Sequence, residues 1–160
     1  MHTRAVSLGT RGVMSHRTAM KRRNPSAPAR WLYSYGYIKG RALDFGCGHG
    51  MDAKHYDMET YDPYWHPDMP TGLFDTIICV YVLNVVAEST QWNIVERIQD
   101  KLTKDGKAYF AVRRDIKSDR RGKGCIQRRI ELPFKSIKKT SGFEIYEVTK
   151  CQTVKRSKQS

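Results

Sequence analysis

Apolar residues follow two patterns along the chain, one typical of strands and one typical of helices. The two patterns together predict a series of short strands and helices. Strand-like composition predicts four buried strands, over residues 41–45, 58–61, 74–81 and 107–113. Spacings of three and four residues predict three helices, over residues 27–35, 51–56 and 89–102. Strands that alternate with helices over short loops indicate an α/β fold with a mostly parallel, Rossmann-like sheet.

The first and last of these helices have a predicted buried face. In the first, Trp31, Leu32 and Tyr35 are expected to face the core. Ser89 is the expected N-cap of the last helix, because serine accepts a hydrogen bond from a free N–H group of the first turn. The apolar stripe of that helix consists of Trp92, Val95, Ile98 and Leu102.

The patterns are weaker in the last third of the chain. Residues 114–124 are charged and contain glycine, which predicts a mobile loop. Beyond it we expect a strand over residues 125–132, a short helix over 134–140 and a final strand over 143–148.

The length of 160 residues fits one domain. We expect a basic segment over residues 1–25, with Met14 as an alternative start, the domain over 26–150 and a basic tail over 151–160. No apolar run reaches the roughly 18 residues of a membrane span, and no secretory signal is recognisable. The four cysteines lie far apart, which favours free thiols in a reducing cytoplasm and argues against a metal site.

A glycine-rich turn carries the strongest chemical signal. A predicted strand leads into a predicted helix through the segment Leu43-Asp44-Phe45-Gly46-Cys47-Gly48-His49-Gly50. Such glycines let the backbone approach a ligand closely, and the helix N-terminus offers free N–H groups. Asp62 ends the next strand, where a carboxylate accepts hydrogen bonds from both hydroxyls of a ribose. The context predicts a site for a nucleoside-containing cofactor.

Asp44 indicates which cofactor this is. A carboxylate at the head of the glycine turn disfavours a pyrophosphate and favours a cationic ligand, such as the amino group of a methionine moiety. Dinucleotide sites also favour the spacing Gly-x-Gly-x-x-Gly, and here the third glycine is one residue early. Both observations favour S-adenosylmethionine over a nicotinamide dinucleotide.

These segments resemble the motifs of class I S-adenosylmethionine-dependent methyltransferases. Residues 42–48 resemble motif I, Tyr61-Asp62-Pro63 resembles the acidic motif II, and residues 74–86 resemble the fourth strand and its loop. More narrowly, residues 14–150 resemble short methyltransferases of phages and mobile elements and methyltransferases associated with DNA phosphorothioation. The segments that carry the narrower resemblance are residues 16–19, 25–28, 62–64 and 81–85.

The resemblance implies roles for individual residues. Asp62 would hold the ribose hydroxyls, and Pro63 and Tyr64 would flank the adenine. Residues 81–84 would lie beside the transferring methyl group. The methionine and ribose end of the cofactor would lie in the turn formed by Asp44, Gly46, Cys47, Gly48 and Gly50.

The chain departs from the family pattern after Asp62. Only eleven residues separate Asp62 from Phe74, whereas a parallel crossover needs about a dozen. The usual third strand and its helix therefore cannot both be present. We therefore expect a loop over residues 63–73 and a truncated third-strand region. The adenine site would lack the contacts that the third strand normally supplies.

Candidate catalytic residues follow the strand over 74–81. Asn84 would accept a hydrogen bond from an amine, although a turn or capping asparagine is the simpler interpretation. Tyr81 is the second candidate. The segment Asp62-Pro63-Tyr64-Trp65 lies after the wrong strand for the Asp-Pro-Pro-Tyr motif of DNA amino-methyltransferases. Cys79 lies inside a strand, which indicates a buried cysteine and not a nucleophile.

The net charge of +13 is unevenly distributed. Residues 1–43 hold nine basic and no acidic side chains, residues 44–105 hold four basic and eleven acidic, and residues 106–160 hold sixteen basic and five acidic. Basic flanks favour a polyanionic partner such as nucleic acid, although solvated tails have the same composition. The expected phosphate-binding residues are Arg17, Lys21, Arg22, Arg113, Arg114, Arg120, Arg121, Arg128 and Arg129.

Three functions remain open from the sequence. The first is methyl transfer from S-adenosylmethionine to nucleic acid, either DNA or RNA. The second is methyl transfer to a protein or small molecule, with the basic regions serving only as tails. The third is a non-catalytic nucleic-acid-binding protein that keeps the cofactor fold.

Overall fold

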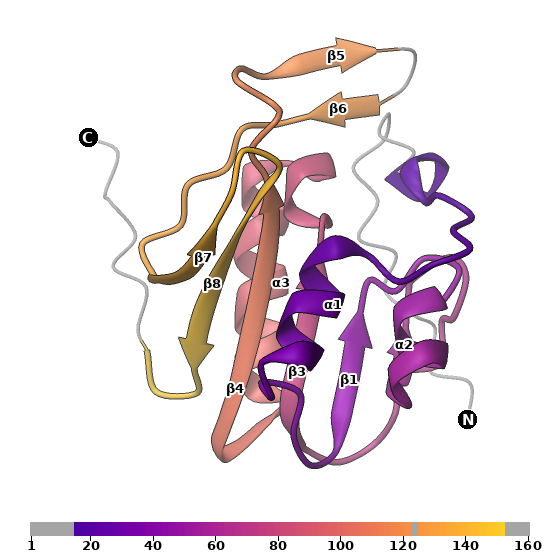
Figure 1. The fold of residues 1–160 in the computed structure, drawn as a ribbon, viewed down its shortest axis with the longest axis vertical. Helices are drawn as coiled ribbons and strands as arrows, with labels where there is room; N and C mark the ends of the chain where they lie inside the picture. Colours follow the sequence, from indigo (N-terminus) through magenta and orange to yellow (C-terminus); the bar gives the residue numbers. More distant parts are fainter. Residues whose placement is uncertain (1–14, 123–124, 153–160) are drawn as a thin grey trace.

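The computed structural model describes residues 15–122 and 125–152. Its centre is a six-stranded sheet in the order β2-β1-β3-β4-β8-β7, and β5 and β6 form a separate hairpin (Figure 1). The strands are β1 (Ala42–Phe45), β2 (Glu59–Tyr61), β3 (Phe74–Val80), β4 (Leu102–Arg113), β5 (Arg120–Gly122), β6 (Cys125–Gln127), β7 (Lys135–Lys139) and β8 (Phe143–Thr149). The helices are α1 (Ala27–Ser34), α2 (Met51–Tyr56) and α3 (Glu88–Asp100), with 3-10 turns η1 (Ser15–Thr18) and η2 (Leu83–Val85).

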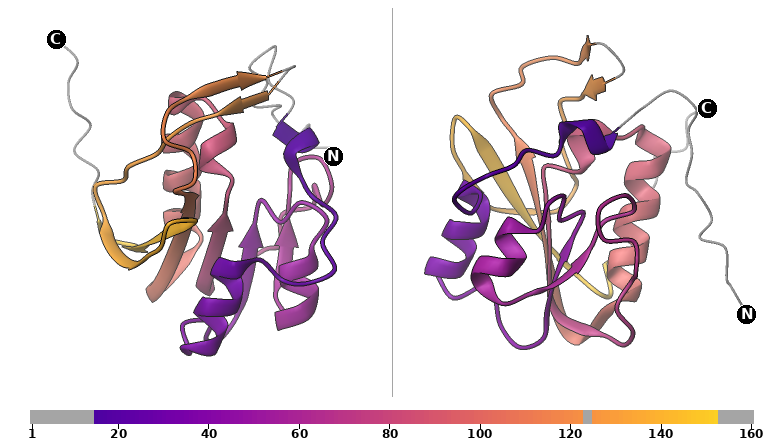
Figure 2. Two further views of the ribbon diagram at one scale, coloured as in Figure 1. Left: turned by 45° about the horizontal axis from the view of Figure 1, so that its top comes forward. Right: turned by 90° about the vertical axis from the view of Figure 1, so that its right-hand side faces the viewer.

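The sheet is parallel on one side and antiparallel on the other. Strands β2, β1, β3 and β4 run parallel, and β8 pairs antiparallel with both β4 and β7. Helices α1 and α2 cover one face and α3 covers the opposite face (Figures 1 and 2). Each face has its own core, with Leu32 of α1 against Ile78 and Ile145, and Ile98 of α3 against Phe110. The predicted Rossmann-like α/β fold is confirmed.

The truncation after β2 is also confirmed. In the described residues β2 is the edge strand, and residues 62–73 form a loop that crosses to β3. The loop turns sharply at its start, where Asp62 and His66 exchange two backbone hydrogen bonds. Farther along, Lys101 Nζ donates to the Pro70 carbonyl over 2.8 Å.

Two predicted helix faces need correction. Tyr35 is the C-cap of α1 and is 70% exposed, so Leu32, not Tyr35, anchors that helix. Helix α3 begins at Glu88 with Ala87 as its N-cap, so the N-cap prediction for Ser89 is wrong. The buried residues of α3 are Gln91, Ile94, Val95 and Ile98, and Trp92 is partly buried against the same core. Leu102 lies in β4, next to Phe74.

The predicted helix over residues 134–140 is wrong, because this segment forms strand β7. Pairing with β8 supplies the backbone hydrogen bonds that a helix would have made internally. The predicted strand over 125–132 is shorter than expected, since β6 covers only Cys125–Gln127. The predicted loop over 114–124 contains β5, which pairs with β6.

No described helix is long and apolar enough to cross a membrane. Among residues 15–122 and 125–152, no group of three or more histidine, cysteine, aspartate or glutamate side chains is arranged to hold a metal ion.

Candidate functional site

A cavity of about 840 Å³ lies at the carboxyl ends of β1, β2 and β3. Its volume falls in the range of about 300–1,000 Å³ that is typical of small-molecule and cofactor sites. Its wall is formed by the glycine turn, the loop after β2, the segment from Val80 to Thr90 and residues 16–22, with further side chains from α2 and α3. In an open α/β sheet this is the edge at which ligands bind.

The glycine turn is fixed by the end of β2. The N–H groups of Gly46 and Cys47 both donate to the Tyr61 carbonyl, over 2.7 and 3.1 Å. Gly46 has a φ of 78°, and a Cβ atom there would lie 2.4 Å from Cγ2 of Val82. Glycine is therefore required at this position, both for its backbone conformation and for the close approach of the chain after β3.

Asp62 has a structural role in addition to any role in ligand binding. One carboxylate oxygen accepts a hydrogen bond from the Gly48 N–H over 3.0 Å. The other accepts from the N–H groups of Tyr64 and Trp65, over 2.9 and 3.0 Å. A carboxylate has room for about four such bonds, so Asp62 can still accept from a ligand at the cavity wall.

Asp44 is the most unusual ionisable group in the cavity wall. It is 2% exposed and lies in β1, two residues before Gly46 of the glycine turn. Burial, followed by the carboxylates of Asp52 and Asp62, raises its pKa well above the usual value for aspartate, and Arg22 opposes this rise. A cation placed beside Asp44 would relieve the cost of its buried charge.

Residues 15–26, which we call the strap, cross over the glycine turn (Figure 1). Its C-terminal end is anchored by Ser26, whose N–H and hydroxyl groups each donate to the buried Asp52 over 2.7 Å. Ala19 packs closely against Gly48, since a Cβ atom on Gly48 would lie 3.2 Å from the Ala19 Cβ. The strap therefore forms one wall of the cavity.

Aromatic rings close the strap against the loop after β2. The rings of His16 and Tyr64 are stacked, with centroids 4.0 Å apart and planes 9° apart. The rings of His49 and Trp65 lie 4.2 Å apart beside them. The sequence predicted basic residues of the strap at the mouth of the cofactor site, but it did not predict the anchor of Ser26 on Asp52 or the stacking of His16 on Tyr64.

Tyr81 lies where β3 ends and has strained backbone geometry. Its φ is 60°, which is uncommon for a residue with a side chain, and its N–H donates to the Ala111 carbonyl over 2.9 Å. The half-buried ring lines the cavity, with the Arg22 guanidinium 5.7 Å from its centroid. Burial raises the pKa of Tyr81, so its hydroxyl is neutral at physiological pH. Strained residues of this kind gather at functional sites.

Asn84 lies in η2 and is not among the cavity-lining residues. Its side chain is fully buried, its Nδ2 group donates to the Arg128 carbonyl over 2.7 Å, and its Oδ1 atom accepts from the Arg113 N–H over 3.0 Å. These bonds join η2 to the end of β4 and to the segment after β6. The structure supports the turn interpretation of Asn84 and contradicts a role beside the methyl group.

The predicted phosphate-binding arginines have different environments. Arg114 is buried and forms an ion pair with Glu144 over 2.7 Å, with further hydrogen bonds to the Ile130 carbonyl and the Tyr146 hydroxyl. Arg114 is therefore part of the core, and its assignment to phosphate binding is wrong. Arg22 is the one member of the predicted set that lines the cavity in the described part of the chain.

The other predicted cations lie outside the cavity wall. Arg113 pairs with Asp115, and Arg129 pairs with Glu131 over 3.3 Å. Arg128 donates to the Val86 carbonyl over 3.1 Å. The exposed side chains are Lys21, Arg120 and Arg121, and the side chain of Arg17 lies outside the described residues.

Most of the predicted cofactor residues do line the cavity. They are Asp44, Gly46, Cys47, Gly48, Asp62, Pro63 and Tyr64. Gly50 is instead the N-cap of α2 and is not among the lining residues. The structure adds Arg97, whose guanidinium lies over the rings of Phe45 and Tyr61, and the apolar residues Met69, Val85, Val86 and Ile94.

A family model described as a methyltransferase domain matches residues 16–146. The chain belongs to this methyltransferase family. The match begins in the strap and ends in β8, so it includes the whole cavity wall. No curated protein matches the sequence.

Solved methyltransferases have a similar fold. The 1,6-didemethyltoxoflavin-N1-methyltransferase of Burkholderia thailandensis is 14% identical, with a TM-score of 0.55 over 76% of each chain. The magnesium protoporphyrin IX methyltransferase of Synechocystis is 12% identical, with a TM-score of 0.49 over 76% of this chain and 79% of that one. PKMT2 of Rickettsia typhi is 21% identical, with a TM-score of 0.35 over 45% of this methyltransferase and 20% of that protein.

The methyltransferase thus spans a fifth of the Rickettsia protein and about three quarters of the other two. Family and fold together make it a class I, S-adenosylmethionine-dependent methyltransferase. The cavity fits this cofactor, because it joins a buried carboxylate, a glycine turn and a carboxylate at the end of β2.

Proposed function

We propose that this enzyme transfers a methyl group from S-adenosylmethionine to nucleic acid. The observation that carries the proposal is the position of the strap, which places Arg22 in the wall of a cavity whose other wall holds Asp44, while Lys21 and Arg23 are exposed on the strap. Within the described residues, Arg22 acts electrostatically on the buried Asp44 but forms no close ion pair with an acidic side chain. A cation of this kind at the mouth of a methyltransferase cavity favours an anionic substrate.

The chain's own residues account for cofactor binding. Asp44 would hold the amino group of the methionine moiety, and Asp62 would accept hydrogen bonds from the ribose. Pro63 and Tyr64 would flank the adenine, with His16 already stacked on Tyr64. The bound cofactor supplies a methyl group on a positively charged sulfur, and that sulfur is a good leaving group because it departs as a neutral thioether.

Tyr81 would position the methyl acceptor. Because its hydroxyl is neutral, it would donate or accept a hydrogen bond and would not act as a strong base. Transfer from a sulfonium needs an aligned lone pair more than it needs proton removal, so positioning is sufficient. Asp52 and Ser26 would act at a distance by fixing the strap.

Other features of the proposal rest on the sequence. The resemblance to methyltransferases of phages and mobile elements, and to those associated with DNA phosphorothioation, is consistent with a nucleic-acid substrate. A cytoplasmic location stays a prediction from the cysteine pattern.

A small-molecule acceptor is the second candidate. The apolar wall formed by Met69, Val85, Val86 and Ile94 favours it, because such a surface suits a compact aromatic ligand. On this alternative the basic strap would serve only as a solvated surface.

Transfer of radiolabelled methyl groups to separate DNA, RNA, protein and small-molecule fractions tests the proposal. Label in DNA or RNA is the expected result. Label confined to protein or small molecules would support the alternative, and cofactor binding without label in any fraction would indicate a non-catalytic protein. Asp44→Asn should abolish transfer, whereas Asp57→Asn, a matched change at the exposed end of α2, should not.

A further inference from the structure

Helix α1 and the residues that follow it expose a group of aromatic rings. The ring of Trp31 lies 4.9 Å from that of Tyr35 and 5.2 Å from that of Tyr37. Tyr35 is 70% exposed and contributes nothing to the core. None of these three residues lines the methyltransferase cavity. Neither the fold nor the proposed catalytic role therefore explains the exposed ring of Tyr35.

Strand β7 places lysines beside these rings through an irregular register. Lys135 pairs with Glu147 and Lys138 pairs with Ile145, although an undisturbed strand would send residues 135 and 138 to opposite faces. The β-bulge between Ser136 and Lys138 shifts the alternation of side chains between the two faces by one residue. Both lysines consequently share the sheet face that α1 covers, and Lys138 Nζ lies 5.7 Å from the centre of the Trp31 ring.

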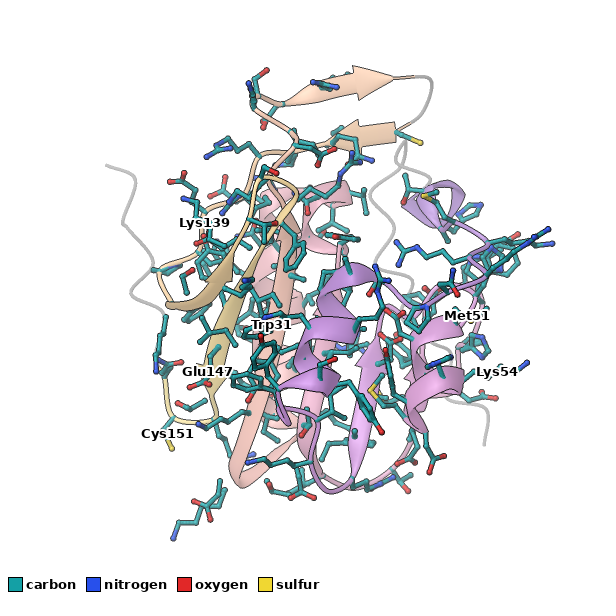
Figure 3. The ribbon with its side chains drawn as sticks, in the orientation of Figure 1. Trp31, Met51, Lys54, Lys139, Glu147 and Cys151 are labelled. Carbon is teal, nitrogen blue, oxygen red and sulfur yellow. The ribbon has the colours of Figure 1, made fainter. Side chains whose placement is uncertain are left out.

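The surface formed by Trp31, Tyr35, Tyr37, Lys135 and Lys138, which we call the α1–β7 face, has little negative charge. Residues 27–40 and 133–143 contain no aspartate or glutamate. The neighbouring Glu147 is 13% exposed at its side chain and pairs with Lys107 over 3.4 Å. Figure 3 shows Trp31 on the side of α1 that is turned toward β8 and β7.

The α1–β7 face also lies at an edge of the sheet. In the described part of the chain, β7 ends the strand order and has a neighbour on one side only. Lys139 is a further exposed cation near the carboxyl end of β7, on the opposite face of the strand from Lys138 (Figure 3). An extended ligand along this edge would contact lysines and exposed rings at the same time.

We propose that the α1–β7 face binds single-stranded nucleic acid. Phosphates would pair with Lys135 and Lys138, and an unpaired base would stack on Tyr35, supported from behind by Trp31. Sites for single strands combine a basic track with aromatic rings, because every base presents a flat face for stacking. A duplex would offer only phosphates to this surface, since its bases are already stacked.

The inference shares with the proposed function only the class of ligand. It concerns a surface separate from the cavity, and its test needs no cofactor and no methyl transfer. A failure of the methyl-transfer assay would therefore leave it standing, and its own failure would leave the catalytic proposal intact.

Fluorescence anisotropy with a labelled oligothymidylate of about 12 nucleotides measures this binding on the full chain. Tyr35→Ala should weaken binding at least about fivefold, which corresponds to the loss of one stacked base. Lys135→Gln/Lys138→Gln should weaken it as well and should flatten the log–log salt dependence by about 1.4, at about 0.7 per phosphate contact on a single strand. The matched control is Lys54→Gln/Lys104→Gln, which removes two exposed lysines elsewhere.

Heparin separates stacking from charge, because it is a polyanion without bases. The lysine variant should lose heparin affinity, and Tyr35→Ala should keep it. Equal loss of oligothymidylate affinity in the control and the lysine variant would overturn the proposal, as would an unchanged affinity of Tyr35→Ala. A change in oligomeric state in either variant without nucleic acid would also overturn it, in favour of self-association through β7.

Discussion

Single residues in this methyltransferase serve both the fold and the site, and Asp62 is the clearest case. The sequence predicted Asp62 as a ribose ligand from its place at the end of a strand. It could not show that the same carboxylate accepts three backbone hydrogen bonds, because those donors approach only when the loop after β2 folds back. Replacing Asp62 by alanine would therefore disturb the glycine turn as well as the proposed ribose contact.

Asp44 offers a cleaner test of cofactor binding through pH. Its pKa is raised in the free protein, and an adjacent ammonium group would lower it by favouring the ionised form. Cofactor affinity should therefore increase as the pH rises through the raised value, with release of a proton on binding below it. Calorimetric titration over a series of pH values, in buffers that differ in ionisation enthalpy, measures both effects.

The control for this titration is Asp44→Asn. The variant should bind more weakly and lose the pH dependence, because its amide does not ionise. If Asp44→Asn keeps the pH dependence of the wild-type protein, the pH dependence of cofactor affinity arises from another group.

The ion pair of Arg114 and Glu144 predicts a residue-scale effect on stability. Burial acts to raise the pKa of Glu144, but hydrogen bonds from Ser136 and Arg114 outweigh it and lower the pKa overall. The pair therefore stabilises the fold above the usual pKa of glutamate, and this contribution is lost as the pH falls through the lowered value. Glu144→Gln should cost about 3–5 kcal/mol at neutral pH, because it leaves a buried guanidinium without a counter-charge.

Urea unfolding measures that cost, and the neighbouring arginine supplies the comparison. Arg113 forms an exposed pair with Asp115, so Arg113→Gln should cost about 0–1 kcal/mol. Similar costs for the two variants would show that burial does not distinguish the pairs.

At the scale of elements, the sequence predicted best where local pattern and tertiary context agree. The helix over 51–56 is confirmed to the residue, and the strand over 74–81 to within one. The segment 134–140 was predicted as a short helix ending at Gly142, yet pairing with β8 makes it a strand. The sequence predicted Arg17, Lys21 and Arg22 of the strap around the mouth of the cofactor site. It could not predict the fixed conformation of the strap, because this depends on a bond between Ser26 and Asp52, far apart in the chain.

The strap gives an element-scale prediction. Ser26→Ala removes the hydrogen bond that the Ser26 hydroxyl donates to the buried Asp52, and the one that it accepts from the Ala29 N–H as the N-cap of α1. The loss should cost about 1.5–3 kcal/mol of stability. Because Ala19 and Arg22 line the cavity, cofactor affinity should fall as well. Thermal unfolding and calorimetric titration measure the two effects.

Ser34→Ala is the matched control for the strap, since Ser34 is exposed at the other end of α1. It should change neither quantity appreciably. Loss of stability in Ser26→Ala with undiminished cofactor affinity would show that the strap is not part of the binding site.

At the scale of the whole molecule, charge is arranged around the carboxyl edge of the sheet. The acidic centre of the chain includes Asp44, Asp52 and Asp62 beneath the cavity, and the basic strap lies over it. The hairpin of β5 and β6 projects beyond this edge with Arg120 and Arg121 exposed, and β6 contacts η1 of the strap (Figures 1 and 2). The uneven charge of the sequence thus becomes a basic rim around an acidic cavity.

This arrangement predicts how nucleic-acid affinity depends on salt. Each phosphate contact releases a counterion, so the log–log slope of affinity against salt should be negative by about 0.9 per contact on duplex and 0.7 on a single strand. Arg120→Gln/Arg121→Gln should weaken binding uniformly across sequences and flatten the slope by at most about two contacts. Cofactor affinity should not change, because neither residue lines the cavity. Anisotropy titrations over a range of salt concentrations measure the slope, and an affinity that does not respond to salt would favour the small-molecule acceptor.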